Sequence, residues 1–594
     1  MALNAVSSAA FSSQGTLPLP CHLMTVRKPS CIIRLLPAQM RNSTPRASAF
    51  YTPKENDKAV RDYFLNCVND EIQFHLEEKQ SCDDSSASYS DVSLLEKLQA
   101  IQMHILESQQ WNASKLQLCH SRKYLASATN MIHYMAFRSY LDCDDDPNFL
   151  LSLFNWETIK SHVLASLTAN IQLVKNLKSN SLHPEDHISS KILYQEQNNA
   201  TLFNTQEMRK KASSNRELLF GQFQDTRTPH IMVTVGQEAI ESESLLITDL
   251  INAGTTLFRI NCAHGNPSTW SEIIRRVREI SQMLKKPCRI LMDLAGPKLR
   301  TGTLKTAPSL MKISPKKTTE KTSIRLRIGD LLIVSRGSFS DQNEFSSAQR
   351  ITCSSGYLFD SVKPGDSIAF DDGKIWGKIV KIIGKSEIVV SITHASPKGT
   401  KLKPEKSINI PESNIQFEGL TSKDLMDLEF VADNADIVGL SFVRHPNDIS
   451  VLRRELEKRK LENLGIILKI ETKSAFEKLP LLLLEAMKCG NPLGVMIARG
   501  DLAVECGWEK MADLQEEIIT ICEAAQVPVI WATQVLESLV KFGIMPTRAE
   551  ITDAATAMRA SCVMLNKGKY IVRGVSSLEK ILHPSTKMKP DYLL

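Results

Sequence analysis

The sequence predicts an α/β protein whose central unit is a (β/α)8 TIM barrel, interrupted by a small β-barrel lid domain and preceded by an all-helical extension. Three observations predict this fold. Eight short runs rich in β-branched residues recur about 30 residues apart beyond residue 228, which leaves room for one helix between successive strands. The stretch between the third and fourth runs is rich in Lys, Ser, Thr and Gly, and the residues before 228 follow a helical pattern.

The composition is that of a globular protein. The chain has 594 residues, 42% of them hydrophobic, which is enough to fill the cores of three or four domains. No uncharged apolar run approaches the roughly 18 residues of a membrane span, so we expect no membrane association. The 13 cysteines include no C-x-x-C pair. They therefore argue against a disulfide framework or a thiolate zinc site and favour a reducing compartment.

Residues 1–50 have the composition of an organelle transit peptide. They contain five basic residues, many Ser and Ala, and no Asp or Glu, and so account for most of the net charge of +6. The late placement of the arginines favours a plastid over a mitochondrion, with a cytosolic protein carrying an ordinary tail as the alternative. Because the excess charge belongs to this segment, it does not indicate a nucleic-acid partner.

Residues 51–227 predict a helical accessory domain. Apolar residues recur every three to four positions from Leu94 to Leu106 and again from Ile132 to Tyr140, as in amphipathic helices. This region contains no arrangement of residues that suggests catalysis.

The barrel is predicted in two parts, residues 228–302 with strands one to three and residues 411–594 with strands four to eight. The expected strands are Ile231–Gly236, Thr256–Asn261, Cys288–Leu294, Ile437–Val443, Gly465–Glu471, Gly494–Asp501, Val527–Thr533 and Ser561–Asn566. Nearly all of these runs carry a polar or charged residue at or within two positions of their carboxyl end, namely Asn261, Asp293, Ser441, Glu471, Asp501, Thr533 and Asn566. In this fold the carboxyl ends of the strands carry the chemistry, so these ends predict an active site.

Residues 303–410 predict a β domain inserted after the third strand. Gly329-Asp330, Gly365-Asp366 and Asp371-Asp372-Gly373 are turn signals between alternating runs such as Leu331–Val334 and Ile375–Ile383. An insertion at this point would overhang the active end of the barrel as a lid.

One group of charged residues at the strand ends predicts phosphoryl chemistry. Lys469 and Glu471 lie two apart on a strand, so both side chains point to the same face, and Asp501 ends the next strand. Two neighbouring carboxylates are what Mg²⁺ usually takes from a protein. The amide of Gly500 at a helix start can hold an anion, while Arg259 and Lys469 supply positive charge for a phosphoryl group.

The chain from about Pro229 to Leu582 resembles the pyruvate kinase family. The motifs that carry this resemblance are FRINCAHG (258–265), MDLAGPKLRTG (292–302), FDDGKI (370–375), GLTSKD (419–424), LSFVR (440–444), LKIE (468–471), MIARGDLAVE (496–505), ATQVLES (532–538) and PTRAE (546–550). The resemblance covers about 350 of the 594 residues. It implies transfer of phosphate from phosphoenolpyruvate to ADP, with pyruvate and ATP as products and Mg²⁺ or Mn²⁺ as cofactor.

The resemblance also implies individual roles. Glu471 and Asp501 would bind the divalent ion, Lys469 would stabilise the phosphoryl group and the enolate, and Thr533 would help deliver a proton to the enolpyruvate carbon. The implied substrate contacts are Arg259 for the phosphate and the turn of Ala498, Arg499, Gly500 and Asp501 for the carboxylate. The implied residues on the nucleotide side are Asn261, His264, Arg300, Lys406 and Asp372.

The monovalent-cation site departs from the family pattern. Asn261 and Asp293 remain, but the expected hydroxyl residues are replaced by Ala263 and Leu294, and the usual Glu is Lys298. Family members with Lys there resemble enzymes that work without potassium. We therefore expect the Lys298 ammonium to stand near Asp293 in place of the ion, so that a potassium requirement is doubtful.

Two further departures bear on activity. The turn after the eighth strand is Asn566-Lys567-Gly568-Lys569 in place of Ser-Gly-Glu-Thr, where the lysines hold phosphates or mark drift at a solvated loop. Only 12 residues follow Leu582, so we expect neither the family's C-terminal domain nor activation by fructose bisphosphate.

Three functions remain open from the sequence. The first is an active pyruvate-kinase-like enzyme, as a homo- or hetero-oligomer. The second is a catalytically weak homologue that acts as a non-catalytic subunit or scaffold through its helical region. The third, an aldolase or lyase on a related barrel, is disfavoured by the inserted domain and by Arg300 and Lys406.

Overall fold

The computed structural model describes residues 94–143, 159–180, 207–222, 228–241, 245–305, 323–337, 348–353, 355–412 and 419–583. The predicted transit peptide, residues 1–50, lies outside the described residues. None of the described helices is long and apolar enough to cross a membrane. The nine cysteines in the described ranges are all free thiols.

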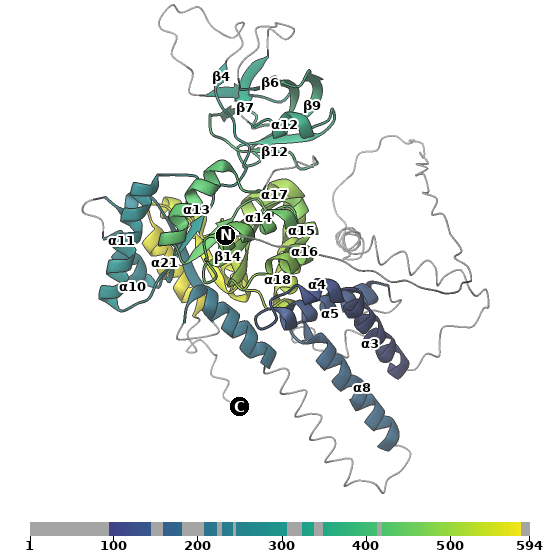
Figure 1. The fold of residues 1–594 in the computed structure, drawn as a ribbon. Helices are drawn as coiled ribbons and strands as arrows, with labels where there is room; N and C mark the ends of the chain where they lie inside the picture. Colours follow the sequence, from purple (N-terminus) through teal and green to yellow (C-terminus); the bar gives the residue numbers. More distant parts are fainter. Residues whose placement is uncertain are drawn as a thin grey trace, which may run out of the picture. The chain divides into compact units, whose positions relative to one another are not determined.

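Eight parallel strands close into a barrel, as predicted (Figure 1). Around the barrel the order is β1, β17, β16, β15, β14, β13, β3 and β2. Each strand starts within two residues of its predicted position; the bounds are β1 His230–Val235, β2 Leu257–Asn261, β3 Arg289–Asp293, β13 Ile437–Leu440, β14 Gly465–Ile470, β15 Leu493–Ala498, β16 Val529–Ala532 and β17 Cys562–Leu565. The fourth and sixth strands end three residues earlier than predicted, because the chain turns before Ser441 and enters a helix at Arg499.

Helices connect the strands. They are α10 Leu246–Ala253, α11 Pro267–Leu284, α13 Ser422–Asn434, α14 Pro446–Lys458, α15 Lys473–Glu477, α16 Leu479–Ala486, α17 Arg499–Cys506, α18 Met511–Ala524, α19 Glu537–Phe542, α20 Arg548–Thr556 and α21 Ile571–Leu582, with short 3₁₀ turns at Gln237–Ala239, Trp508–Lys510 and Ala557–Arg559. Their starts follow local sequence signals. Thr421 and Thr547 each form a capping box, and Asn266 caps α11 just before Pro267.

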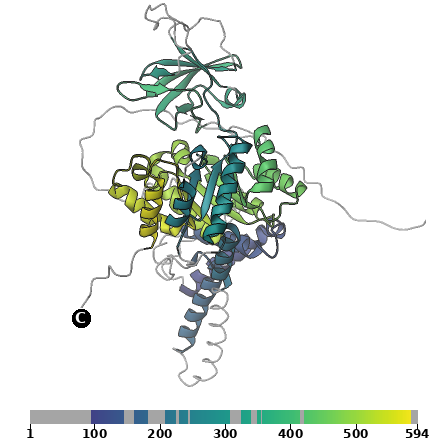
Figure 2. The ribbon, with the colours of Figure 1, turned by 90° about the vertical axis from the view of Figure 1, so that its left-hand side faces the viewer.

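The inserted domain lies in the sequence between β3 and α13. It contains β4 Leu304–Lys305, β5 Ile324–Leu326, β6 Leu331–Arg336, β7 Gln349–Cys353, α12 Tyr357–Ser361, β8 Ser367–Phe370, β9 Ile375–Ile383, β10 Glu387–His394, β11 Thr400–Leu402 and β12 Ile408–Asn409. Seven of these strands form a curled sheet, and β5 pairs separately with β11 (Figure 2). This domain has its own apolar core. The two runs predicted as strands here, Leu331–Val334 and Ile375–Ile383, are confirmed as β6 and β9.

The helical region before the barrel consists of α3 Leu94–Trp111, α4 Ala113–Gln117, α5 Leu125–Asp142, α8 Val163–Asn180 and a helix over residues 207–220. The predicted amphipathic helices are thus confirmed, and α5 packs against α16 and α18 of the barrel. Polar contacts fix this packing: the Tyr124 hydroxyl donates to the carbonyl of Asn491 (2.7 Å), and the Asn130 amide donates to the carbonyl of Ala524 (2.8 Å). The region therefore docks on the barrel through specific buried contacts.

The helix over 207–220 closes the amino-terminal end of the barrel. Its residues Leu219 and Phe220 are buried in the same apolar cluster as the inward-facing strand residues Met232, Leu257, Leu291, Ile437, Ile467, Met496, Ile530, Ala532, Cys562 and Met564. Glycines at the starts of two strands make room for this plug, because a Cβ on Gly465 or Gly494 would stand 2.8 or 2.5 Å from Leu219. Arg289 holds the helix end by donating to the carbonyls of Leu218 (2.8 Å) and Leu219 (3.0 Å).

Candidate active site

The carboxyl ends of β2, β3, β13 and β14 bring a buried cluster of charges together. Asp293 is its centre. Its carboxylate accepts hydrogen bonds from Arg259 Nε (2.9 Å) and Nη2 (2.5 Å) and lies 3.1 Å from Lys469 Nζ. Burial alone would raise the pKa of Asp293, but Lys469 and Arg259 outweigh it and hold the pKa below its usual value. Gly439 on β13 allows this approach, since a Cβ there would stand 2.6 Å from Asp293 Oδ1.

Lys469 links this cluster to the predicted metal ligand. Its Nζ lies 3.0 Å from Glu471 Oε1 and donates to Ser441 Oγ at 2.8 Å. Asp293, Glu471 and Ser441 therefore surround the buried Lys469 ammonium as hydrogen-bond acceptors. Burial lowers the pKa of Lys469, but the neighbouring Asp293 and Glu471 carboxylates raise it above its usual value. Lys469 is accordingly charged.

Glu471 is a buried carboxylate of the site. Its other oxygen, Oε2, accepts from the backbone N–H of Phe442 at 2.6 Å. Phe442 has φ 56°, a left-handed conformation that costs a bulky residue energy and is typical of functional turns. Burial raises the pKa of Glu471, Lys469 opposes this shift, and the nearby Asp501 and Asp293 charges add to it. A cation near Glu471 and Asp501 would relieve their repulsion.

Lys298 lies beside Asp501 and not beside Asp293. Its Nζ donates to Asp501 Oδ1 at 2.7 Å and lies 4.0 Å from Asp372 Oδ1 of the insertion. The expectation of an ammonium next to Asp293 is therefore wrong in this structure. The reason is that Arg259 and Lys469 already neutralise Asp293, which leaves Lys298 to pair with the carboxylate of α17.

The turn from β15 into α17 faces Thr533. The Gly500 amide donates to Thr533 Oγ1 at 3.1 Å, and Thr533 has φ 68°, so this threonine too is held in a strained conformation. The Arg499 side chain makes its contacts within the protein. Its guanidinium donates to the carbonyl of Ala532 (3.0 Å), pairs with Asp553 and stacks over Trp531 at 4.6 Å. Arg499 thus stabilises the turn through contacts with β16 and α20.

The residues implied for the nucleotide side lie in two groups. Asn261 ends β2 and His264 follows it, and the Asn261 carboxamide accepts from the backbone N–H of Ala263 at 3.0 Å. Burial lowers the pKa of His264, and Lys567, Arg300 and Arg259 lower it further. Lys567, in the turn after β17, therefore contributes positive charge near His264, as Arg300 does.

The second group joins the barrel to the insertion. Arg300 Nη1 donates to the carbonyl of Glu405 at 3.1 Å, and Lys406 Nζ lies 2.9 Å from Asp371. Asp372 Oδ1 accepts from the Ser407 hydroxyl at 2.7 Å. Sequence reasoning missed Asp371, although its neighbour Asp372 was predicted, and it missed the bridging hydroxyl of Ser441, whose only signal was its place at a strand end.

Within the described residues no group of three or more His, Cys, Asp or Glu side chains is arranged to hold a metal ion. A pair of carboxylates, Glu471 and Asp501, is what the site offers. This set suits Mg²⁺, which keeps most of its ligands as water and substrate oxygens.

The fold and this site define a (β/α)8-barrel protein with an inserted β domain and a buried lysine-carboxylate cluster at the carboxyl ends of its strands. Residues 226–575 match the family model described as pyruvate kinase, barrel domain. The chain belongs to the pyruvate kinase family.

Curated relatives agree with this assignment. The chain is 32% identical over 375 residues to a pyruvate kinase of Thermotoga maritima, covering 61% of this chain and 72% of that protein. It is 32% identical over 363 residues to a pyruvate kinase of Bacillus licheniformis (60% and 56%) and 34% identical over 363 residues to pyruvate kinase 2 of Synechocystis (60% and 56%). The chain thus spans little more than half the length of two of these relatives.

Proposed function

We propose that this protein transfers the phosphoryl group of phosphoenolpyruvate to ADP, giving pyruvate and ATP. One observation carries the proposal: the buried Lys469 ammonium sits between Asp293 (3.1 Å) and Glu471 (3.0 Å) at the active end of the barrel. A fixed cation in a dry site stabilises charge that develops during the reaction. The named activity of the relatives and their shared motifs support the same reaction.

The two carboxylates fit a divalent cofactor. Glu471 and Asp501 would hold it. Burial is the main cause of the raised pKa of Glu471, the Asp501 charge adds to it, and a bound cation would oppose both effects. When bound, such an ion neutralises phosphate and enolate oxygens. Lys298 pairs with Asp501 at 2.7 Å, so an ion held by Asp501 would lie next to this ammonium.

Side chains of the protein supply the remaining functions, which are charge stabilisation, proton delivery and substrate binding. Lys469 stabilises the negative charge on the transferring phosphoryl group and on the enolate. Thr533 Oγ1 accepts from Gly500, which leaves its own O–H free to donate toward the enolate carbon, directly or through water. Arg259, oriented by Asp293 and by Thr234 (3.1 Å), faces the phosphate. Arg300, Lys406 and Asp372 form the nucleotide side.

A coupled assay tests this reaction. The full chain is expected to form pyruvate only when phosphoenolpyruvate, ADP and Mg²⁺ are all present, because charge neutralisation and both substrates are needed together. Omission of any one of the three is the matched control. No pyruvate under the complete conditions would contradict the proposal and favour the non-catalytic subunit or scaffold.

We also propose that the reaction is independent of potassium. Two positions that would offer hydroxyl oxygens are Ala263 and the buried Leu294, and Asp293 is already neutralised by Arg259 and Lys469. When a large organic cation replaces potassium at constant ionic strength, kcat is expected to change by no more than about twofold. A change of about 1.4 kcal/mol in the activation free energy would alter the rate about tenfold. A severalfold rise with potassium would overturn this proposal.

A further inference from the structure

Helix α17 carries two carboxylates on one side. Asp501, the predicted metal ligand, lies in its first turn, and Glu505 lies four residues later. Residues four apart in a helix are neighbours on its surface. Burial raises the pKa of Glu505, and the Asp501 charge adds to this rise, against the opposing effects of Asn409 and Arg444. The partners of Glu505 therefore bear on how α17, and Asp501 with it, is held.

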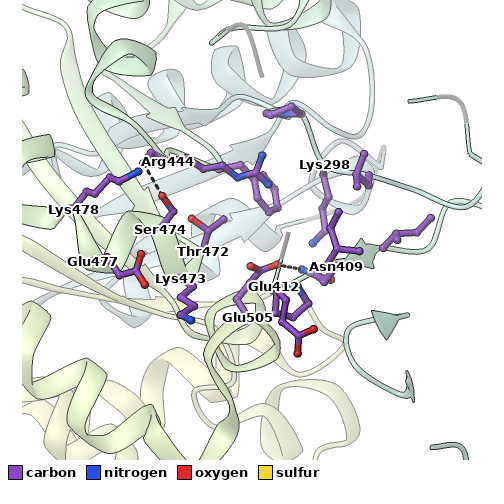
Figure 3. Close-up of a pocket in the computed structure, with 16 residues that line it drawn as sticks. Lys298, Asn409, Glu412, Arg444, Thr472, Lys473, Ser474, Glu477, Lys478 and Glu505 are labelled. Carbon is purple, nitrogen blue, oxygen red and sulfur yellow. Dashed lines mark hydrogen bonds between the residues drawn. The ribbon is translucent and has the colours of Figure 1, made fainter. Parts of the chain in front are cut away.

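The hydrogen-bond partner of Glu505 belongs to the inserted domain. Glu505 Oε1 accepts from Asn409 Nδ2 at 3.0 Å, the contact drawn as a dashed line in Figure 3. Asn409 is 4% exposed and ends β12, the last strand of the insertion. Removal of either partner would leave the other without this hydrogen bond, which costs more than the bond contributes. This contact therefore ties α17 of the barrel to β12.

β12 also holds the groups expected to face the nucleotide. It pairs with β8, and the turn after β8 carries Asp371 and Asp372. The carbonyl of Ser407, two residues before Asn409, accepts from the backbone N–H of Asp371 at 3.0 Å, and the Ser407 hydroxyl donates to Asp372 at 2.7 Å. Lys406 pairs with Asp371 at 2.9 Å. A displacement of β12 would therefore move Lys406 and Asp372 relative to the barrel.

Two further contacts link α17 to the same turn of the insertion. Lys298 Nζ lies 2.7 Å from Asp501 Oδ1 and 4.0 Å from Asp372 Oδ1. Gly373, with φ 80°, lies so close to α17 that a Cβ there would stand 3.2 Å from Val504. Helix α17 is thus linked to the insertion from its first turn to its last.

We propose that Glu505 is a positioning residue for the phosphotransfer reaction, and this inference rests on the function proposed above. Through Asn409 it holds β12 against α17, so that Lys406 and Asp372 keep a fixed place relative to the metal ligand Asp501. A nucleotide that binds a preordered surface loses less affinity to the ordering of that surface. Loss of the contact should therefore weaken the use of ADP and spare phosphoenolpyruvate, whose expected contacts lie on the barrel.

Steady-state kinetics of the full chain test this role. Glu505→Ala and Asn409→Ala are each expected to raise KM for ADP about tenfold, as expected for loss of one buried hydrogen bond. Each should leave KM for phosphoenolpyruvate within about twofold. Because both variants break the same contact, the double variant should be no worse than either single one. Glu505→Gln keeps an acceptor for the Asn409 amide and should behave as the wild type.

Glu412→Ala is the matched control. Glu412 lines the same pocket as Glu505 and Asn409. It accepts from the N–H and the hydroxyl of Ser367 (2.9 and 3.1 Å), which belongs to the insertion, so its contact does not reach the barrel. Glu412→Ala should therefore leave both KM values within about twofold of the wild type.

Amide hydrogen exchange separates this inference from the reaction itself, because it needs no substrate. Asn409→Ala, a change in the insertion, is expected to speed exchange in the last turn of α17 about tenfold, since the lost contact opposes local opening. Glu412→Ala should leave this exchange unchanged. If the wild-type chain forms no pyruvate, the proposed reaction fails, and the exchange result still decides whether Glu505 holds β12.

Four results would each overturn the positioning role. The first is equal protection of α17 in Asn409→Ala and in the wild type. The second is an equal change of both KM values in the two single variants. The third is a double variant in which the two effects multiply. The fourth is a Glu505→Gln variant as impaired as Glu505→Ala.

Discussion

Replacement of Lys469 by methionine is expected to lower kcat for pyruvate formation by about a thousandfold. Methionine keeps much of the length of the side chain but removes the ammonium that lies 3.0 Å from Glu471 and 3.1 Å from Asp293. A preorganised donor in a buried site commonly contributes a factor of about 10² to 10³ to the rate, and here the donor also carries a full charge. The effect should fall on kcat more than on KM for ADP, because Arg300 and Lys406 have other partners, Glu405 and Asp371.

The fold should survive this change, which makes the kinetic result interpretable. Asp293 keeps its two hydrogen bonds from Arg259, and Glu471, whose pKa is already raised by burial, can take up a proton. Circular dichroism of the variant should therefore match the wild type. The control is Lys541→Met, which removes an exposed lysine of α19 that pairs with Glu537. A Lys469→Met enzyme with a kcat within tenfold of the wild type would contradict the assigned role.

Replacement of Leu219 by aspartate is expected to lower the free energy of unfolding by at least about 3–5 kcal/mol. Leu219 is fully buried and inserts between the starts of β14 and β15, against Gly465 and Gly494. The substitution loses the packing of a large side chain and buries a carboxylate without a partner, and both are costly. Urea denaturation followed by circular dichroism measures the change.

The neighbouring residue provides a matched control. Leu218 lies in the same helix but is 44% exposed, so Leu218→Asp should change the free energy of unfolding by less than about 1 kcal/mol. Equal effects of the two substitutions would mean that the helix over 207–220 does not plug the barrel. A selective effect of Leu219→Asp would show that the helix over 207–220 contributes to the stability of the barrel.

The strands were predictable because buried parallel strands leave a strong signal in the sequence. Each is a short run of apolar, largely β-branched residues, as in Gly465–Ile470, and the intervening helices carry their own caps. The pairing of Lys469 with Glu471 was predictable for the same reason, since the period of two along a strand puts both side chains on one face. These are local properties, and the sequence records them directly.

Contacts between loops were not predictable. Lys298 was expected near Asp293 but pairs with Asp501, which is 203 positions further along the chain. Arg499 lies in the turn expected to hold the substrate carboxylate, and its side chain stabilises that turn through Asp553 and Trp531. In both cases several partners of suitable charge or chemistry were available. Only the positions of the backbone decide which of them comes within hydrogen-bond distance.

The sequence by itself determined the barrel, the inserted domain, the family and the residue types at the strand ends. Tertiary structure alone decided how the helical region docks and that Leu219 closes the barrel. The physical reason is the separation along the sequence of the residues that interact. Strand and helix patterns depend on neighbours a few positions away. Docking, plugging and ion pairing depend on side chains hundreds of positions apart, whose meeting is fixed by the packing of the whole fold.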